Sequence, residues 1–93
     1  MSSAPPSWTL RVPKHATKEL LRAPRPERER LLAALEALAR DPFAGDVEPL
    51  KGQPNTFRRR VGNWRLFFDV DRSRRLVDVT DIVRRTTTTY RKR

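Results

Sequence analysis

The sequence predicts one small α+β domain with the element order β-α-α-β-β-β and a sheet of about four strands. Three patterns lead to this fold class: runs in which apolar and polar residues alternate with a period of two, a stripe of leucines at helical spacing, and a Gly-Asn pair between two strand-like runs. The 93 residues include 22 Leu, Ile, Val and Phe, which suffices for one hydrophobic core but leaves no room for a second domain or a large cofactor cleft. We expect residues 1–7 to form a flexible arm and residues 8–93 to form the domain.

The first half of the chain contains one predicted strand and two predicted helices. Trp8–Val12 alternates between apolar and polar residues, as a half-buried strand does. Lys14–Arg22 has apolar residues at helical spacing and predicts a short helix. A second helix begins at Pro26, because proline fits the first helical turn, and it ends before Asp41-Pro42. Its apolar stripe consists of Leu31, Leu32, Leu35, Leu38 and Ala39.

The second half of the chain predicts a loop followed by three strands. Residues 43–55 are rich in proline, glycine and acidic side chains, and we expect a loop there. Phe57–Val61 and Trp64–Val70 predict the strands of a β-hairpin, which a two-residue turn at Gly62-Asn63 joins. Leu76–Val83 predicts the last strand, although its alternation is imperfect.

The two-residue turn determines which hairpin side chains share a face. It places Arg60 opposite Arg65 and Arg58 opposite Phe67, so these four side chains lie on one face. The other face is apolar and belongs to the core, with Arg59 as its exception. Like charges at this spacing destabilise a sheet unless an anion lies between them. The arginine face is therefore a predicted anion-binding site.

The positive charge of the chain lies mainly in its second half. There are 21 Lys and Arg against 11 Asp and Glu, a net charge of +10. Residues 1–56 carry a net +2 and residues 57–93 a net +8. This excess is typical of a protein that meets a polyanion, and the lack of a long basic amphipathic helix favours nucleic acid over a membrane surface. We therefore expect the hairpin half to contact nucleic acid.

The residues that the chain lacks exclude several kinds of site. There is no Cys, which excludes disulfide frameworks, zinc–thiolate sites and Cys-His catalytic sites, and the single His cannot build an imidazole cluster. We expect no metal ion or other cofactor, and a surface position for His15. No apolar run approaches the roughly 18–20 residues needed to cross a bilayer, and the N-terminal residues lack the pattern of a secretory signal. We expect a soluble cytoplasmic protein.

An arginine face is suited to RNA cleavage. RNA carries its own nucleophile, the 2′-hydroxyl group, so a protein can cleave it by aligning that oxygen with the adjacent phosphate and stabilising the charge of the transition state. Arginines supply the stabilisation but stay protonated, so Tyr90, a lysine or the surroundings of the substrate must transfer protons. Hydrolysis of DNA needs a metal ion or a stronger nucleophile, and the sequence shows neither.

From Trp8 to Tyr90, the chain resembles the RelE/ParE superfamily of bacterial type II toxins. The resemblance lies in residues 38–42 (Leu-Ala-Arg-Asp-Pro), residues 50–52 (Leu-Lys-Gly), the hairpin from Phe57 to Leu66, and Arg84-Arg85 followed by Tyr90-Arg91. It implies an antiparallel or mixed sheet with the two helices packed on one face. In the RelE branch it also implies cleavage of messenger RNA in the ribosomal A site.

The resemblance also assigns roles to residues. It implies catalytic roles for Arg58, Arg60, Arg65, Arg84 and Tyr90. Together with the charge pattern it suggests RNA contacts by Lys51, Arg59, Phe67, Arg85 and Arg91. Arg85 takes the place of Arg84 if the strand end shifts by one residue. Some members have lysines at the positions of Arg58 and Arg60, so a lysine proposed there as general base has no equivalent in this chain.

Two other functions remain open on the sequence. ParE-like relatives share the fold but are thought to inhibit DNA gyrase without cutting RNA, and a non-enzymatic RNA-binding module would also carry this charge. The resemblance implies an acidic antitoxin as partner in a hetero-oligomeric complex, beside the ribosome and mRNA. Residues 57–93, with a net charge of +8, would bind polyanions non-specifically if they were left uncovered. We therefore expect the antitoxin to cover part of the arginine face or to displace the C-terminal segment.

Overall fold

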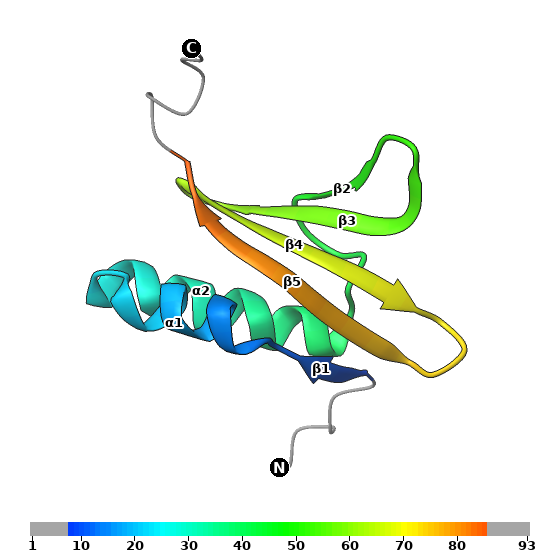
Figure 1. Ribbon diagram of the computed structural model, residues 1–93, viewed down its shortest axis with the longest axis horizontal. Coiled ribbons are helices and arrows are strands. Elements are labelled where there is room, and N and C mark those ends of the chain that lie inside the picture. The colour runs from blue at the N-terminus through cyan, green and yellow to red at the C-terminus, as the bar shows by residue number, and fades with distance from the viewer. Residues whose placement is uncertain (1–7, 86–93) are drawn as a thin grey trace.

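Two helices lie against one face of a twisted mixed sheet, and the other face of the sheet carries no helix (Figure 1). The computed structural model describes residues 8–85. Its five strands are arranged in the order β1-β5-β4-β3-β2. The elements are β1 (Thr9–Arg11), α1 (Lys14–Arg22), α2 (Arg25–Arg40), β2 (Val47–Leu50), β3 (Gln53–Val61), β4 (Trp64–Asp71) and β5 (Leu76–Arg84). This arrangement confirms the predicted α+β class.

Both predicted helices are present, and each buries most of its apolar stripe. The prediction is wrong for Leu32, which is 45% exposed because it lies off the buried side of α2. In α1 the buried residues are Ala16 and Leu20. The 16 residues of α2 start within one residue of the predicted position, with Pro26 in the first turn. Helix α2 ends at Arg40, and Asp41 is extended. The buried side chains of α2 are Leu31, Ala34, Leu35, Leu38 and Ala39. Among the described residues, no helix is both long and apolar enough to cross a membrane.

The hairpin has the predicted register. Val61 pairs with Trp64, and the ladder continues to Phe57 opposite Phe68. Gly62 has a φ of 58° in the turn, a left-handed conformation that glycine adopts without strain. Along β4, buried residues alternate with half-buried ones. The buried set of β4, which faces the helices, consists of Trp64, Leu66, Phe68 and Val70.

The predicted loop at residues 43–55 is wrong in part, because it contains the edge strand β2 and the start of β3. Glu48 of β2 pairs with Arg58 in an antiparallel ladder. The strand was hidden because its four residues do not alternate between apolar and polar and because Pro49 lies among them. Proline donates no backbone hydrogen bond and is tolerated at a sheet edge. The sheet therefore has five strands rather than about four.

A bulge in β5 explains the imperfect alternation of that strand. Phe67 pairs with Asp81 and Phe68 with Val79, so Thr80 is an extra residue in the ladder. The Thr80 hydroxyl donates a hydrogen bond to the Phe67 carbonyl oxygen at 3.2 Å. The bulge brings Ile82 into the core, where the unbroken alternation would have placed Asp81.

Arg59 anchors the connection between α2 and β2. It lies on the helix-facing side of β3, as the register predicted, and its Nη1 donates a hydrogen bond to the Ala44 carbonyl oxygen at 2.8 Å. The guanidinium group packs against Gly45, whose φ is +86°. A Cβ atom at Gly45 would lie 2.6 Å from Arg59 Nη1. The single basic residue on the apolar face is thus used to hold a loop.

Replacing Gly45 by Ala tests this anchor, with Gly52 as the matched control. Both glycines have positive φ, so Ala is strained at either position by about 1–2 kcal/mol. Only at Gly45 does Ala also force Arg59 away from the Ala44 carbonyl. We expect G45A to lower the free energy of unfolding by about 1 kcal/mol more than G52A, measured by urea denaturation. A difference that persists in an Arg59→Ala background would show that this contact is not the cause.

Candidate functional site

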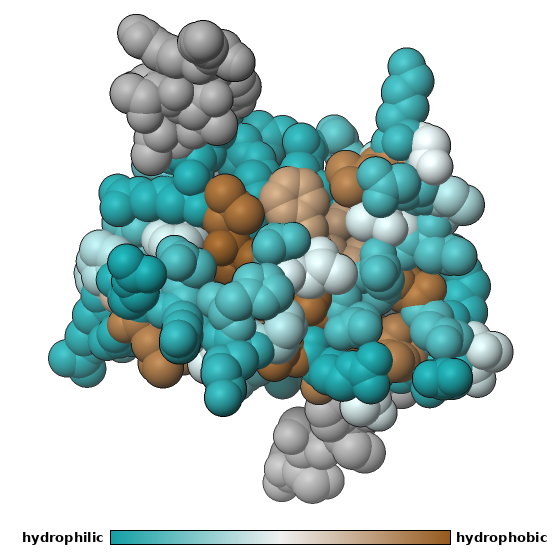
Figure 2. Space-filling model, viewed as in Figure 1, coloured by the Kyte–Doolittle hydropathy of each residue, from teal (hydrophilic) through white to brown (hydrophobic). Residues whose placement is uncertain are grey.

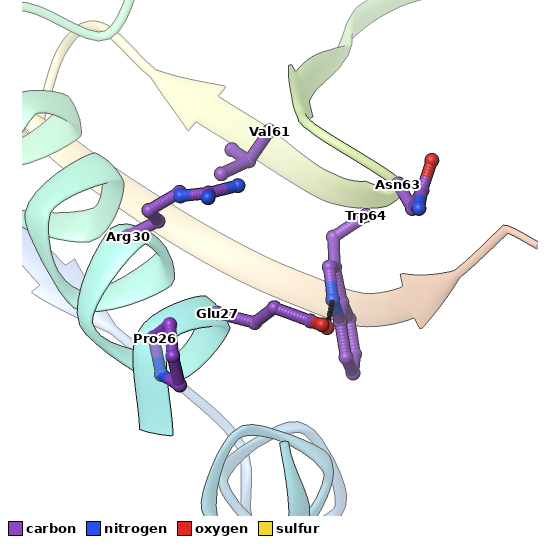
Figure 3. Close-up of a pocket in the computed structure, with 6 residues that line it drawn as sticks. All are labelled: Pro26, Glu27, Arg30, Val61, Asn63 and Trp64. Carbon is purple, nitrogen blue, oxygen red and sulfur yellow. Dashed lines mark hydrogen bonds between the residues drawn. The ribbon is translucent and has the colours of Figure 1, made fainter. Parts of the chain in front are cut away.

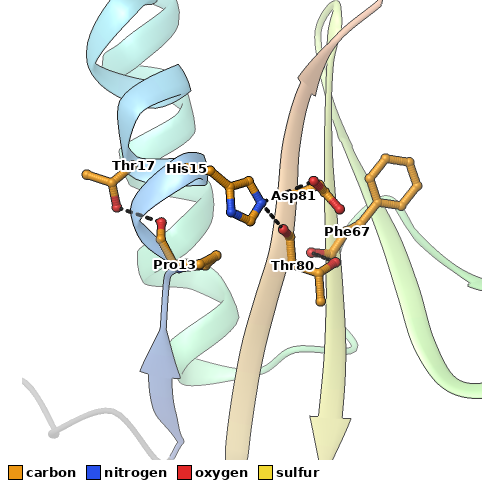
Figure 4. Close-up of polar contacts among 6 residues, drawn as sticks. All are labelled: Pro13, His15, Thr17, Phe67, Thr80 and Asp81. Atoms are coloured by element: carbon orange, nitrogen blue, oxygen red, sulfur yellow. Dashed lines mark hydrogen bonds and ion pairs between the residues drawn. The ribbon is translucent and has the colours of Figure 1, made fainter.

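The arginine face, made by Arg58, Arg60, Arg65 and Phe67, lies on the side of the sheet opposite the helices. Arg60 is directly opposite Arg65, and Arg58 is directly opposite Phe67. Arg65 Nη1 donates to the Trp64 carbonyl oxygen at 3.2 Å, beside the hairpin turn. Figure 4 shows the Phe67 ring pointing away from helix α1. The structure therefore brings these four predicted site residues together.

Two carboxylates, Glu48 in β2 and Asp46 directly before it, pair with two of the three arginines. Arg58 Nη2 lies 2.6 Å from Glu48 Oε1, and Arg60 Nε lies 3.2 Å from Asp46 Oδ2. The Arg58 side chain is 25% exposed and that of Arg60 is 45% exposed. The anion that the opposed arginines require is thus supplied by the chain itself. These pairs were not predicted, because residues 46 and 48 were assigned to a loop.

The two late arginines point to different faces, as neighbours in a strand do, and the bulge determines which face each one takes. Arg84 is opposite Trp64, in the helix-facing register, and Val83 takes the place opposite Arg65. By strand alternation, the next residue, Arg85, belongs to the side of Arg65. The Arg85 backbone N–H donates to the Asn63 carbonyl oxygen at 2.6 Å and extends the pairing beyond the hairpin turn. Both arginines are exposed.

The other predicted RNA contacts do not gather at the arginine face. Lys51 lies in the turn between β2 and β3, roughly 23 Å along β3 from Arg60 at the rise of a β-strand. Arg59 lies on the opposite side of the sheet and holds the Ala44 loop. Tyr90 and Arg91 lie outside the described residues.

On the helix side of the hairpin turn, a small pocket shows how the hairpin is held to α2 (Figure 3). Trp64 Nε1 donates a hydrogen bond to Glu27 Oε1 at 2.7 Å. This contact joins residues that are 37 positions apart in the sequence, so it could not be predicted from local sequence patterns. It fixes the end of the hairpin that presents Arg65. The pocket is lined by Pro26, Glu27, Arg30, Val61, Asn63 and Trp64.

His15 connects α1 to the bulge of β5 (Figure 4). Its Nε2 atom lies 2.7 Å from the Thr80 carbonyl oxygen and 3.3 Å from Asp81 Oδ1. Since a carbonyl oxygen only accepts, Nε2 carries a proton and donates. The side chain of His15 is 64% exposed, which confirms the expected surface position. Its contacts hold the strand segment that determines where the late arginines fall.

The face carries fixed positive charge. A guanidinium group donates hydrogen bonds and stays protonated, so it stabilises charge on a phosphate but cannot remove a proton. Within residues 8–85, no three His, Cys, Asp or Glu side chains form a group that could hold a metal ion. Away from this face, the Ser73 hydroxyl lowers the pKa of Asp71, and a hydrogen bond to Asp78 raises the pKa of Arg11.

On its visible side the surface is mostly hydrophilic, and apolar side chains reach it in separate small patches (Figure 2). One exposed apolar residue belongs to the arginine face: Val83, which is 44% exposed and lies opposite Arg65. Together with Phe67 it gives the face an apolar component beside the guanidinium groups. Aromatic and apolar surface next to arginines suits the stacking of unpaired bases.

Comparison with solved structures identifies the same fold in toxins. RelE in the archaeal RelE–RelB complex from Pyrococcus horikoshii OT3 has a TM-score of 0.78 and 21% identity, over 87% of this chain and 98% of that one. The isolated E. coli RelE toxin has a TM-score of 0.75 and 20% identity, over 88% of each chain. The YoeB/ParE toxin from Agrobacterium tumefaciens has a TM-score of 0.70 and 22% identity, over 84% of this chain and 99% of that one.

The family itself is shown by the sequence. Comparison with the curated proteins found no significant match. Residues 10–88, however, match the family model described as ParE toxin of type II toxin-antitoxin system, parDE. This stretch takes in nearly all of every strand and helix, and the match confirms the resemblance drawn from the hairpin and the late arginines. The chain belongs to the ParE toxin family and is a type II toxin of the RelE/ParE superfamily.

Proposed function

We propose that this toxin is a ribosome-dependent endoribonuclease that cleaves messenger RNA in the ribosomal A site. The observation that carries the proposal is the register of the hairpin, which sets Arg60 directly opposite Arg65 and Arg58 next to them on a face without helices. Three guanidinium groups on one open surface are suited to a phosphate whose charge increases in the transition state. The exposed edge of Val83 and the ring of Phe67 offer contacts for a base.

In the proposed reaction the 2′-oxygen of one nucleotide attacks the adjacent phosphorus atom. The bond from phosphorus to the 5′-oxygen of the next nucleotide breaks, which leaves a 2′,3′-cyclic phosphate and a free 5′-hydroxyl group. One proton leaves the 2′-hydroxyl and one reaches the departing 5′-oxygen, so the reaction is balanced without water or metal. Arg58, Arg60 and Arg65, with Arg84 or Arg85, stabilise the phosphate oxygens. Tyr90 or a group of the ribosome transfers the protons.

An antitoxin partner belongs to the same proposal. RelE of Pyrococcus horikoshii was solved with RelB, and E. coli RelBE was solved as an intact toxin-antitoxin complex. We expect an acidic antitoxin to cover the arginine face in a hetero-oligomeric complex, since its carboxylates would complement the +8 charge of residues 57–93. The ribosome as target places the toxin in the cytoplasm.

The alternative function, inhibition of DNA gyrase without RNA cleavage, has a specific observation in its favour. The matching family model is that of ParE, whose members the resemblance connects with gyrase. Arg58 and Arg60 are also engaged by Glu48 and Asp46, which a binding role tolerates more easily than a catalytic one.

Programmed ribosomes separate these functions in one set of assays. Purified toxin is added to ribosomes carrying a defined mRNA, the cuts are mapped, and free mRNA serves as the control. Gyrase supercoiling is measured in parallel. Cuts that require the ribosome support the proposal. Blocked supercoiling with intact mRNA supports the gyrase alternative, and RNA binding without either effect identifies a non-enzymatic binding module.

Removing two arginines tests the catalytic face. We expect Arg65→Ala combined with Arg84→Ala to lower the single-turnover rate of cleavage on the ribosome at least about 100-fold, since each lost donor to the charged phosphate costs on this order. Arg22→Ala is the control, because Arg22 is exposed on α1 and pairs with Glu19. The midpoint of urea denaturation confirms folding. An undiminished rate in the folded double variant would contradict the proposal.

The two late arginines are distinguished by single substitutions. Because the bulge places Arg84 in the register of Trp64 and leaves the Arg65 side to Arg85, we expect Arg85→Ala to slow cleavage more than Arg84→Ala. The measurement is the same single-turnover rate. A larger loss for Arg84→Ala would mean that the strand end rearranges when the ribosome binds.

A further inference from the structure

We propose that Glu48 of β2 and Asp46, the residue directly before β2, are counter-anions that determine which polyanion the arginine face accepts. A ligand binds there by replacing these carboxylates with its own phosphates, and a densely charged nucleic-acid backbone does so better than an isolated phosphate. The identity of the ligand as RNA rests on the proposed function, whereas the competition between carboxylate and phosphate rests on the geometry.

The pairing is built into the sheet. Glu48 is directly opposite Arg58 in the β2–β3 ladder, so the two side chains share a face. Asp46 precedes Glu48 by two residues, and its carbonyl oxygen accepts a hydrogen bond from the Arg60 N–H at 3.1 Å. This backbone contact holds the Asp46 carboxylate beside the Arg60 side chain, 3.2 Å from its Nε. Two carboxylates therefore meet two arginines one to one along the same edge.

The acidic partners can leave without disturbing the sheet. The Glu48 side chain is 61% exposed, while that of Arg58 is only 25% exposed. Arg58 Nε is buried and finds no acceptor among residues 8–85. Arg58 is thus held in place with one donor unused, and Glu48 is free to turn into water when a phosphate arrives. Pairs as exposed as these contribute little to folding stability, so removing the acids leaves the fold intact.

Exchange of partners makes the face selective. A single phosphate that displaces Glu48 replaces one charged hydrogen bond by another and gains little. A nucleic-acid backbone presents successive phosphates, and Arg58 and Arg60 are separated by two residues of strand, roughly 7 Å. Both exchanges then occur in one binding event. The carboxylates also lower the affinity of residues 57–93, with their net charge of +8, for polyanions that do not place phosphates at both arginines.

The test measures binding of the full chain to a short single-stranded RNA by fluorescence anisotropy at several salt concentrations. The variants are Glu48→Gln, Asp46→Asn and the double variant. Glu36→Gln is the matched control, because Glu36 is exposed on α2 and its loss changes the net charge equally. Inorganic phosphate serves as the competitor. Cleavage on ribosomes is measured separately with the same preparations.

We expect Glu48→Gln to tighten RNA binding roughly five- to tenfold, against less than about twofold for Glu36→Gln. When the wild-type protein binds RNA, each displaced carboxylate takes up a counterion from solution. Fewer counterions are then released overall, so RNA binding by the wild type depends less on salt than binding by the variants. The slope of log affinity against log salt should therefore steepen by up to about 0.7 for each acid removed, and the control should not change it. Inorganic phosphate should compete more effectively with RNA in the double variant than in the wild type.

Equal affinities and slopes for Glu48→Gln and Glu36→Gln would overturn the inference. A weaker affinity in Glu48→Gln would overturn it too, because Glu48 would then orient Arg58 for the ligand. If no variant binds RNA at low salt, the face is not a polyanion site and the inference fails. Because the readout is binding, a toxin that shows the predicted slopes but does not cut mRNA on ribosomes would refute the proposed reaction and leave the role of the counter-anions standing.

Discussion

The burial of one face of the β3–β4 hairpin is the constraint on which the rest of the structure depends. Because successive side chains of a strand point to opposite faces, the register that packs Trp64, Leu66 and Phe68 under the helices also sends Arg65 to the open side. A slip of one residue would bring guanidinium groups into the core, where an unpaired charge costs several kcal/mol. Hydrophobic packing therefore fixes the arginine face, and the repulsion between its guanidinium groups is too weak to shift the register of the hairpin.

That repulsion is relieved locally by the edge strand and by the residue directly before it. Opposed arginines destabilise a bare sheet, yet Glu48 and Asp46 place a carboxylate at two of the three guanidinium groups. The same strand protects the sheet edge, because it is short, carries charge and contains Pro49. The segment from Asp46 to Leu50 thus both supplies the two carboxylates and protects the sheet edge. Glu48 and Asp46 are exposed and lie outside the core, and their charges offset part of the positive charge of the arginine face.

The parts of the fold that were predictable are those determined by strong local periodicity. The leucine stripe of α2 and the Gly62-Asn63 turn each specify an element, and the turn alone sets the pairing of Arg60 with Arg65. Strand β2 was missed because it forms by pairing with β3, and its own four residues contain no pattern that indicates this pairing. The bulge at Thr80 was missed because one extra residue is visible only against the neighbouring strand. The ion pairs of the site follow from β2 and were hidden with it.

In the proposed reaction, the chemistry of the face is the reason to expect a dependence on the ribosome. Guanidinium groups stabilise a charged phosphate, but none of them takes up the proton of the 2′-hydroxyl group at neutral pH. Their carboxylate partners, Glu48 and Asp46, are neutralised by the arginines and are displaced when phosphates bind. The face therefore supplies electrostatic stabilisation and requires help with alignment and proton transfer. An mRNA held in the A site would have a fixed geometry and would lie beside ribosomal groups that can transfer protons. The toxin would then not have to supply alignment and proton transfer itself, as it would for free RNA.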